Sequence, residues 1–164
     1  ELVSENFALG DVIKMVRQDM KLMLLKKNGH IIYDDEISLH TSKTALQLIV
    51  SNLCKNAIHY NESLAATIQI IAEKTEAHLL LHFKDNGIGI DPEFQEQIFE
   101  MFKRLHSRAE YDGSGLGLAI TKRALDQIGG NISVLSAKGK GSTFTVQLPL
   151  VSMVQQAQPL VQSV

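Results

Sequence analysis

Two short glycine-rich segments, 85–89 and 113–117, constrain this chain more than any other feature of its sequence. The first reads Asp-Asn-Gly-Ile-Gly and follows alternating apolar residues, whereas the second reads Gly-Ser-Gly-Leu-Gly and begins an apolar periodic segment. Alternation predicts a strand over 78–85, and spacings of three to four predict a helix over 116–128. The fold must therefore place one glycine turn at the end of a strand and another at the start of a helix.

Asp85 is the most informative residue of the first segment. Leu79 and Leu81 share one face of the predicted strand, and Asp85 falls on that same apolar side. A carboxylate on a buried face is costly unless a partner satisfies it. One interpretation is a carboxylate that caps the following turn; the other is a contact to a ligand amine such as N6 of adenine. Gly87 and Gly89 would let the backbone approach a flat ring closely.

The second glycine segment and a stripe of polar residues suggest a phosphate site. Backbone N–H groups at a helix N-terminus attract anions, so residues 113–117 form a candidate phosphate cradle, although the spacing of a P-loop or a dinucleotide fingerprint is absent. Asn52, Asn56 and Tyr60 lie four residues apart and so along one face of a predicted helix. The amide oxygen of Asn56 could bind Mg²⁺, or the residue could be a packing asparagine with a backbone partner.

The other segments predict an α+β fold. Strands and helices do not alternate strictly, which favours a two-layer α/β sandwich with a mixed, mostly antiparallel sheet and helices on one face. Asn28-Gly29 is expected to stop the first helix, and Thr41 or Ser42 to cap the second, which runs to about Tyr60. The expected strands are 7–9, 30–34, 66–73, 78–85, 131–136 and 142–148, and the expected helices are 10–27, 42–60, 92–102 and 116–128.

Composition narrows the function classes. The net charge of -2 and the scattered basic residues give no reason to expect nucleic acid or direct membrane contact. The single cysteine, Cys54, allows no internal disulfide and fits a cytoplasmic setting. The chain starts at Glu1 and is expected to be a fragment of a longer protein, which could itself be membrane-anchored. The Gln, Val and Ser-rich segment 150–164 predicts a disordered tail.

The polar stripe and the glycine segments, in this order, resemble the ATP-binding catalytic domain of two-component sensor histidine kinases. That domain belongs to a wider group of Bergerat-type ATPases, with gyrase, heat-shock chaperone and mismatch-repair relatives. The resemblance covers residues 7–149 and includes a lid similar to that of the phytochrome-like branch at 102–106. Its five boxes are the N box 52–60, the first glycine box 85–90, the F box 99–102, the second glycine box 113–118 and the last glycine box 139–144.

The resemblance implies a role for each matching residue. Asp85 would bind the adenine amine, Tyr60 would lie beside the purine, and Asn56 would bind Mg²⁺. Asn52 and Asn56 would line the phosphate side as the catalytic residues, and the second glycine box would hold the phosphates. Phe99 and Phe102 would anchor a lid between the F box and that glycine box, over about 91–114. The implied ATP site consists of Asn52, Asn56, His59, Tyr60, Asp85, Gly87, Gly89, Ile90, Phe102, Arg104, Gly113, Ser114, Gly115, Leu116, Gly117, Leu118 and Thr143.

Two positions depart from patterns of the wider group. His59 stands where the family usually has Lys or Arg, so phosphate affinity is expected to be lower or pH-sensitive, unless the change is simply tolerated. Asn52 stands where the ATPase relatives place a Glu that activates water. Because an amide cannot act as a base, we expect slow ATP hydrolysis.

The acceptor histidine motif of such kinases is absent, and residues 1–6 are expected to be a linker from a missing helical dimerisation and acceptor hairpin. The resemblance therefore implies a Mg-ATP-binding domain that donates the γ-phosphoryl group to a histidine on that hairpin, for relay to a response-regulator receiver domain. Two alternatives stay open: a degenerate, non-catalytic scaffolding module of the same fold, and a serine-specific anti-sigma-type kinase.

Overall fold

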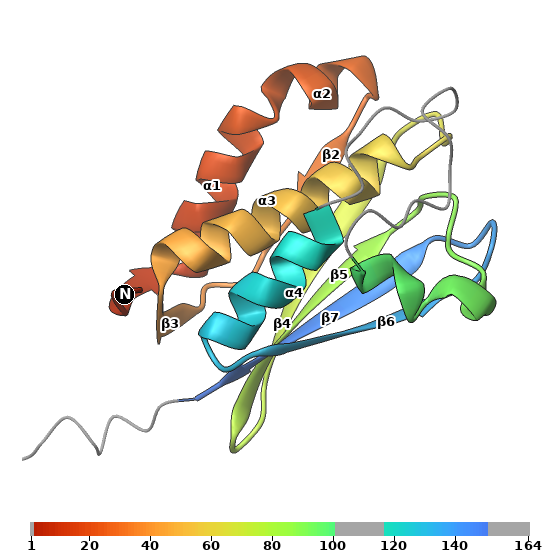
Figure 1. Cartoon of the computed structure of the whole chain (residues 1–164). Helices are drawn as coiled ribbons and strands as arrows, with labels where there is room; N and C mark the ends of the chain where they lie inside the picture. Colours follow the sequence, from red (N-terminus) through yellow and green to blue (C-terminus); the bar gives the residue numbers. More distant parts are fainter. Residues whose placement is uncertain (1, 101–116, 151–164) are drawn as a thin grey trace, which may run out of the picture.

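The structure is a computed structural model that describes residues 2–100 and 117–150 (Figure 1). Its elements follow the chain as β1 (Glu5–Ala8), α1 (Leu9–Asp19), α2 (Lys21–Lys26), β2 (His30–Ile32), β3 (Ser38–Thr41), α3 (Lys43–His59), β4 (Thr67–Lys74), β5 (His78–Asp85), the 3-10 turns η1 (Pro92–Phe94) and η2 (Gln97–Phe99), α4 (Gly117–Gln127), β6 (Asn131–Ser136) and β7 (Ser142–Pro149).

A five-stranded mixed sheet forms one layer of the molecule. Its strand order is β2-β4-β5-β7-β6, with β2 parallel to β4 and the other neighbours antiparallel. The helices form the second layer on one face of this sheet (Figure 1). The predicted α+β sandwich is therefore confirmed.

The central helix α3 packs its apolar face on the sheet. The Ser42 hydroxyl accepts a hydrogen bond from the N–H of Ala45 at 3.2 Å, so Ser42 is the N-cap, as one of the two predicted candidates. Tyr60, expected on the buried face, is the C-cap residue and stays partly exposed. The buried residues of α3 include the predicted Leu46, Ile49, Leu53 and Ala57.

The first predicted helix is divided in two at Met20. Met20 has φ −93° and ψ 6°, outside the helical region, yet its N–H still bonds the Val16 carbonyl at 3.0 Å. The reason is burial: α1 has a fully buried face that ends at Met20, whereas α2 has no buried residue and follows the surface toward β2. The predicted stop is confirmed, because Asn28 has φ 45° and the Gly29 N–H bonds the Leu24 carbonyl at 2.7 Å.

The helix expected over 92–102 is also wrong where it is described. The segment forms two separate 3-10 turns, η1 and η2, with bonds to the third residue back. Its polar groups are used elsewhere: the Gln95 amide donates to the carbonyls of Ile90 at 3.3 Å and Ser136 at 2.9 Å. These bonds hold the segment against β6.

A second, two-stranded sheet was not expected. β3 pairs antiparallel with β1, and its sequence Ser-Leu-His-Thr carries little apolar alternation that would signal a strand. Most of the predicted lid and nearly all of the predicted tail lie outside the described residues. None of the helices that the structure describes is long and apolar enough to cross a membrane.

Candidate functional site

A side-chain hydrogen bond links α3 to the first residue of α4. Asn52 donates from Nδ2 to the Gly117 carbonyl at 3.2 Å and lies 3.4 Å from the Thr121 hydroxyl. Thr121 is fully buried and donates to the same carbonyl at 2.9 Å. The N-terminus of α4 is therefore held beside the asparagine stripe, and anions are favoured at such a helix end.

Asn56 lies one turn further along the stripe. Its Oδ1 is 3.8 Å from where a Cβ would stand on Gly117. Within residues 2–100 and 117–150, no group hydrogen-bonds the Asn56 side chain, so the backbone partner that a packing asparagine would need is not found there. The amide oxygen is thus available to a ligand beside the start of α4.

Asp85 ends β5 on the helix-facing side, where Leu79 and Leu81 are buried as predicted. Its Oδ1 accepts hydrogen bonds from the N–H groups of Gly87 at 2.8 Å and Ser142 at 3.2 Å. Burial raises the pKa of Asp85 from 3.8 to about 6, and the two hydrogen bonds partly oppose that rise. Neither bond uses Oδ2, so the carboxylate caps the glycine turn with one oxygen and can offer the other to a ligand.

The end of α3 lies against the first glycine box. The Tyr60 carbonyl accepts from the Ile88 N–H at 3.1 Å. A Cβ on Gly87 would lie 2.6 Å from that carbonyl and 2.8 Å from Asp85 Oδ1, so the Tyr60 carbonyl and the Asp85 carboxylate both lie against this glycine. The Tyr60 ring makes an edge contact with His59 at 4.9 Å between centroids. The stripe thus reaches from the start of α4 to Asp85.

Gly89 permits a close backbone approach within the protein, which sequence reasoning did not expect. Its φ is +71°, and a Cβ would lie 2.0 Å from the Ala137 carbonyl oxygen. The close approach that Gly89 permits is therefore to the β6–β7 connection, where the Gly139 N–H also donates to the Ile88 carbonyl at 2.7 Å. The adjacent Ile90 donates its N–H to the Ser136 hydroxyl at 2.8 Å. The first glycine box is locked to the last one.

Two asparagines that support the site were missed. Asn61 is 1% exposed and donates to the Ala57 carbonyl at 3.3 Å and to Asn86 Oδ1 at 2.8 Å. Asn86 also accepts from the Thr67 N–H at 2.8 Å and donates to the Ala65 carbonyl at 2.9 Å. This network ties the end of α3 to the glycine turn. Its only sequence signal is a polar residue just beyond the N box, Asn61, and one inside the first glycine box, Asn86.

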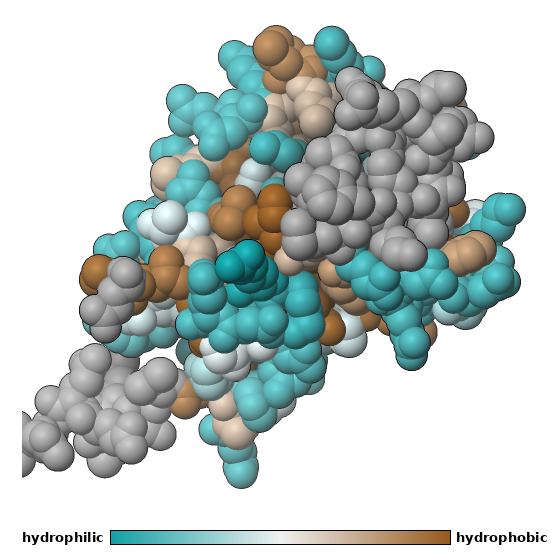
Figure 2. Space-filling model, in the orientation of Figure 1, coloured by the Kyte–Doolittle hydropathy of each residue, from teal (hydrophilic) through white to brown (hydrophobic). Residues whose placement is uncertain are grey.

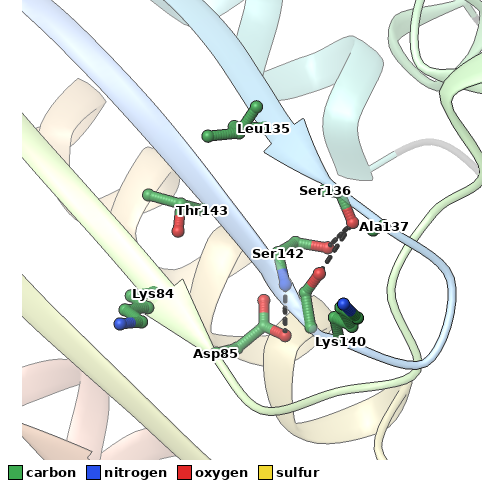
Figure 3. Close-up of a pocket in the computed structure, with 9 residues that line it drawn as sticks. Lys84, Asp85, Leu135, Ser136, Ala137, Lys140, Ser142 and Thr143 are labelled. Carbon is green, nitrogen blue, oxygen red and sulfur yellow. Dashed lines mark hydrogen bonds between the residues drawn. The ribbon is translucent and has the colours of Figure 1, made fainter.

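Thr143 makes no hydrogen bond to Asp85, although both residues line one hollow at the strand ends. Thr143 pairs with Lys84 and Leu135 in the ladder, on the face that carries no helix, and Leu135 is 79% exposed. These three residues line an open hollow of about 260 Å³ at the strand ends (Figure 3). Ser142, one residue earlier, is 7% exposed and bonds Asp85. Ser142 is thus the residue of this box that contacts Asp85, and Thr143 stays a predicted site residue.

The F box and second glycine box are only partly described. The Phe99 ring packs edge-on against Phe144 of β7 at 6.3 Å, which is core packing. Leu118 is partly buried against the core. The predicted site residues Phe102, Arg104, Gly113, Ser114, Gly115 and Leu116 lie outside the described residues.

This arrangement is that of a nucleotide-binding domain in which an asparagine-bearing helix, rather than a P-loop, runs beside the site. A sequence profile of the histidine kinase-, DNA gyrase B- and HSP90-like ATPases matches residues 41–152, and the chain belongs to this family.

Its curated relatives are sensor kinases. The chain is 38% identical over 132 residues to cyanobacterial phytochrome A of Nostoc sp., covering 80% of the chain and 17% of that protein. It is 42% identical over 109 residues to the circadian input-output histidine kinase CikA of Thermosynechococcus vestitus, covering 65% of the chain and 15% of the relative. The chain thus spans less than a fifth of each. It is homologous to histidine kinase catalytic domains, and the serine-kinase alternative is not favoured.

Solved structures share the fold. The catalytic domain of histidine kinase ThkA superposes with a TM-score of 0.74 at 23% identity, covering 90% of this chain and 95% of that one. Full-length ShkA in complex with AMPPNP superposes with a TM-score of 0.78 at 24% identity, covering 91% of this chain and 31% of ShkA.

Proposed function

We propose that this domain binds Mg-ATP along α3 and donates its γ-phosphoryl group to a histidine on a separate helical domain of the same protein, for relay to a response-regulator receiver domain. The observation that carries the proposal is the hydrogen bond from Asn52 to Gly117. It sets the N-terminus of α4 beside Asn56 at one end of a stripe whose other end meets Asp85. Asn52 and Tyr60 are eight residues apart, so the stripe is about 12 Å long, a length that a nucleotide can span.

We assign the end of the stripe that would hold the adenine base, here called the base end, to Asp85. A buried carboxylate with one oxygen fixed by two N–H groups is a specific acceptor for an amine, and we assign it the 6-amino group of adenine. Tyr60 would lie beside the ring. The phosphate end is assigned to Asn52, Asn56 and the glycines of the second box, because N–H groups at a helix start favour anions.

Mg²⁺ is assigned to Asn56. The residues present fit this ion, since an amide oxygen is a ligand that Mg²⁺ accepts and phosphates held at the start of α4 would bring further oxygens. Among the described residues, no group of three or more His, Cys, Asp or Glu side chains could hold a metal ion. The ion would therefore need phosphate oxygens as its other ligands, and it would neutralise charge on the transferring group.

What the chain itself supplies is positioning. No carboxylate stands at Asn52 to activate water, so the bound nucleotide is kept for transfer rather than hydrolysed. The buried, high-pKa thiol of Cys54 is inert and consistent with action in the cytoplasm.

Transfer is tested by mixing the chain with the helical acceptor domain of its parent protein and γ-labelled ATP. We expect acid-labile label on one histidine of the acceptor, and none when the chain carries Asn56→Ala. If Mg-ATP binds but no acid-labile label appears, the domain is a non-catalytic module and the proposal fails.

A further inference from the structure

Three side chains form one row across the neighbouring strands β5, β7 and β6. The register pairs Asp85 with Ser142, and Ser142 with Ser136. The row lies on the helix-facing side, because Ser142 shares its face of β7 with the buried Phe144. The Ser142 N–H donates to Asp85, and the hydroxyl oxygens of Ser142 and Ser136 lie 2.7 Å apart (Figure 3).

The Ser136 hydroxyl has three hydrogen-bond neighbours. The Ile90 N–H, at 2.8 Å, can only donate, and the Gly141 carbonyl, at 2.8 Å, can only accept. The third neighbour is the Ser142 hydroxyl. One serine hydroxyl supplies one proton and two lone pairs. All three bonds form only when Ser136 accepts from Ile90, donates to Gly141 and accepts from Ser142.

The opposite direction between the two serines is less favourable. If Ser136 gave its proton to Ser142, the Gly141 carbonyl would face a lone pair and one hydrogen bond would be lost. The complete arrangement therefore turns the Ser142 proton toward Ser136. Ser142 has no other side-chain partner among the described residues, so toward the site its hydroxyl can only accept.

We infer that Ser136 is a positioning residue that fixes the polarity of the Ser142 hydroxyl and thereby makes the site select purines with a 6-amino group over those with a 6-oxo group. The inference rests on the proposed function, because it assumes that a purine binds at Asp85. An ionised Asp85 also only accepts. Asp85 and the Ser142 hydroxyl then both present acceptors, which match an amine and oppose a carbonyl oxygen.

The test compares ATP with ITP, whose bases differ by a 6-amino against a 6-oxo group. Dissociation constants for both Mg-nucleotides are measured by calorimetry on the whole chain. Ser136→Ala frees the Ser142 proton to donate to the 6-oxo group, so the preference for ATP falls about three- to tenfold, mainly through tighter ITP binding. Ser136→Thr keeps the hydroxyl and restores the wild-type ratio.

Two further variants isolate the role of the hydroxyl. Ser133→Ala is the matched control, because Ser133 lies on the same strand and is exposed, and its ratio stays that of the wild type. Ser142→Ala removes the ordered hydroxyl and also lowers the preference. Adding Ser136→Ala to it changes nothing more, since both residues act through one proton.

The outcomes separate the inference from the proposed function. If Ser136→Ala keeps the wild-type ratio, or weakens both nucleotides equally, the inference is overturned while the proposed function stands. If Ser136→Ala does not fold, Ser142→Ala decides, and an unchanged ratio there overturns the inference. If the wild-type chain does not bind ATP, both the inference and the proposed function are contradicted.

Discussion

Asn52 Nδ2 lies 3.2 Å from the carbonyl oxygen of Gly117, a hydrogen bond between residues 65 positions apart in the chain. This contact joins the N box to the second glycine box, so the proposed phosphate end of the site depends on it. The Gly117 carbonyl keeps a second donor in Thr121, which limits the effect of losing the first.

Removal of the Asn52 amide should therefore affect Mg-ATP affinity more than it lowers the stability of the fold. We expect Asn52→Ala to lower the free energy of unfolding by about 1 kcal/mol, the usual contribution of one hydrogen bond. Mg-ATP affinity should fall clearly. Urea denaturation and nucleotide titration measure the two effects. Lys55→Ala, on the exposed side of α3, is the control and should change neither. Equal binding by Asn52→Ala and the wild type would contradict the assigned role.

A methyl group on Gly89 should be far more damaging than one on Gly139. Both residues have positive φ, +71° and +78°, but a Cβ on Gly89 meets the Ala137 carbonyl at 2.0 Å whereas Gly139 has nothing within 4 Å. Gly139→Ala should cost about 1 kcal/mol for its backbone conformation alone. Gly89→Ala should cost several times more or prevent folding. Thermal unfolding of the two variants measures these losses of stability. Similar losses in both would show that the first and last glycine boxes are not locked together.

Asp85→Asn should stabilise the fold while abolishing nucleotide binding. The native pKa of about 6 lies above the ordinary 3.8, so the folded state holds the proton more tightly than the unfolded chain. Stability from this group is present below pH 3.8 and is lost as the pH rises through about 6. An amide keeps the acceptor oxygen and has no charge to bury.

The stabilisation by Asp85→Asn should therefore depend on pH. It should be near zero at pH 4 and rise to at most about 3 kcal/mol at neutral pH, at 1.36 kcal/mol per pKa unit. Denaturation across this range measures it. A stability difference that shrinks with rising pH would have the wrong sign for this account.

His59→Lys should tighten Mg-ATP binding. His59 borders the stripe at the position where the family resemblance implies a basic residue, and a permanent positive charge there would attract phosphate. We expect about a threefold gain, because partly exposed charge pairs contribute at most about 1 kcal/mol. His30→Lys, at an exposed position on β2, adds the same net charge and should have little effect. Equal gains from both variants would mean that only net charge matters.

Local patterns predicted the fold and part of the site. Strand alternation placed Asp85 on the helix-facing side, and a spacing of four placed Asn52, Asn56 and Tyr60 on one stripe. Each of these two patterns lies within a single strand or helix. The break at Met20 was not predicted, because helical spacing continues through it and only the burial of α1 ends there.

Contacts between distant strands could not be derived in the same way. The last glycine box predicted Thr143, but that Ser142 pairs with Asp85 is seen only in the strand register. The bond between Asn61 and Asn86 likewise joins residues 25 apart and has no periodic signature. Sequence thus indicates which box matters, and the paired structure indicates which side chain.

The most direct test of the central claim is a calorimetric titration of the chain with ATP, with and without Mg²⁺. We predict a single class of sites for the wild type, no binding by Asp85→Asn, and a loss of affinity in Asn56→Ala that appears with Mg²⁺ and vanishes when EDTA removes it. Absence of binding by the folded wild-type chain in the presence of Mg²⁺ would contradict the account.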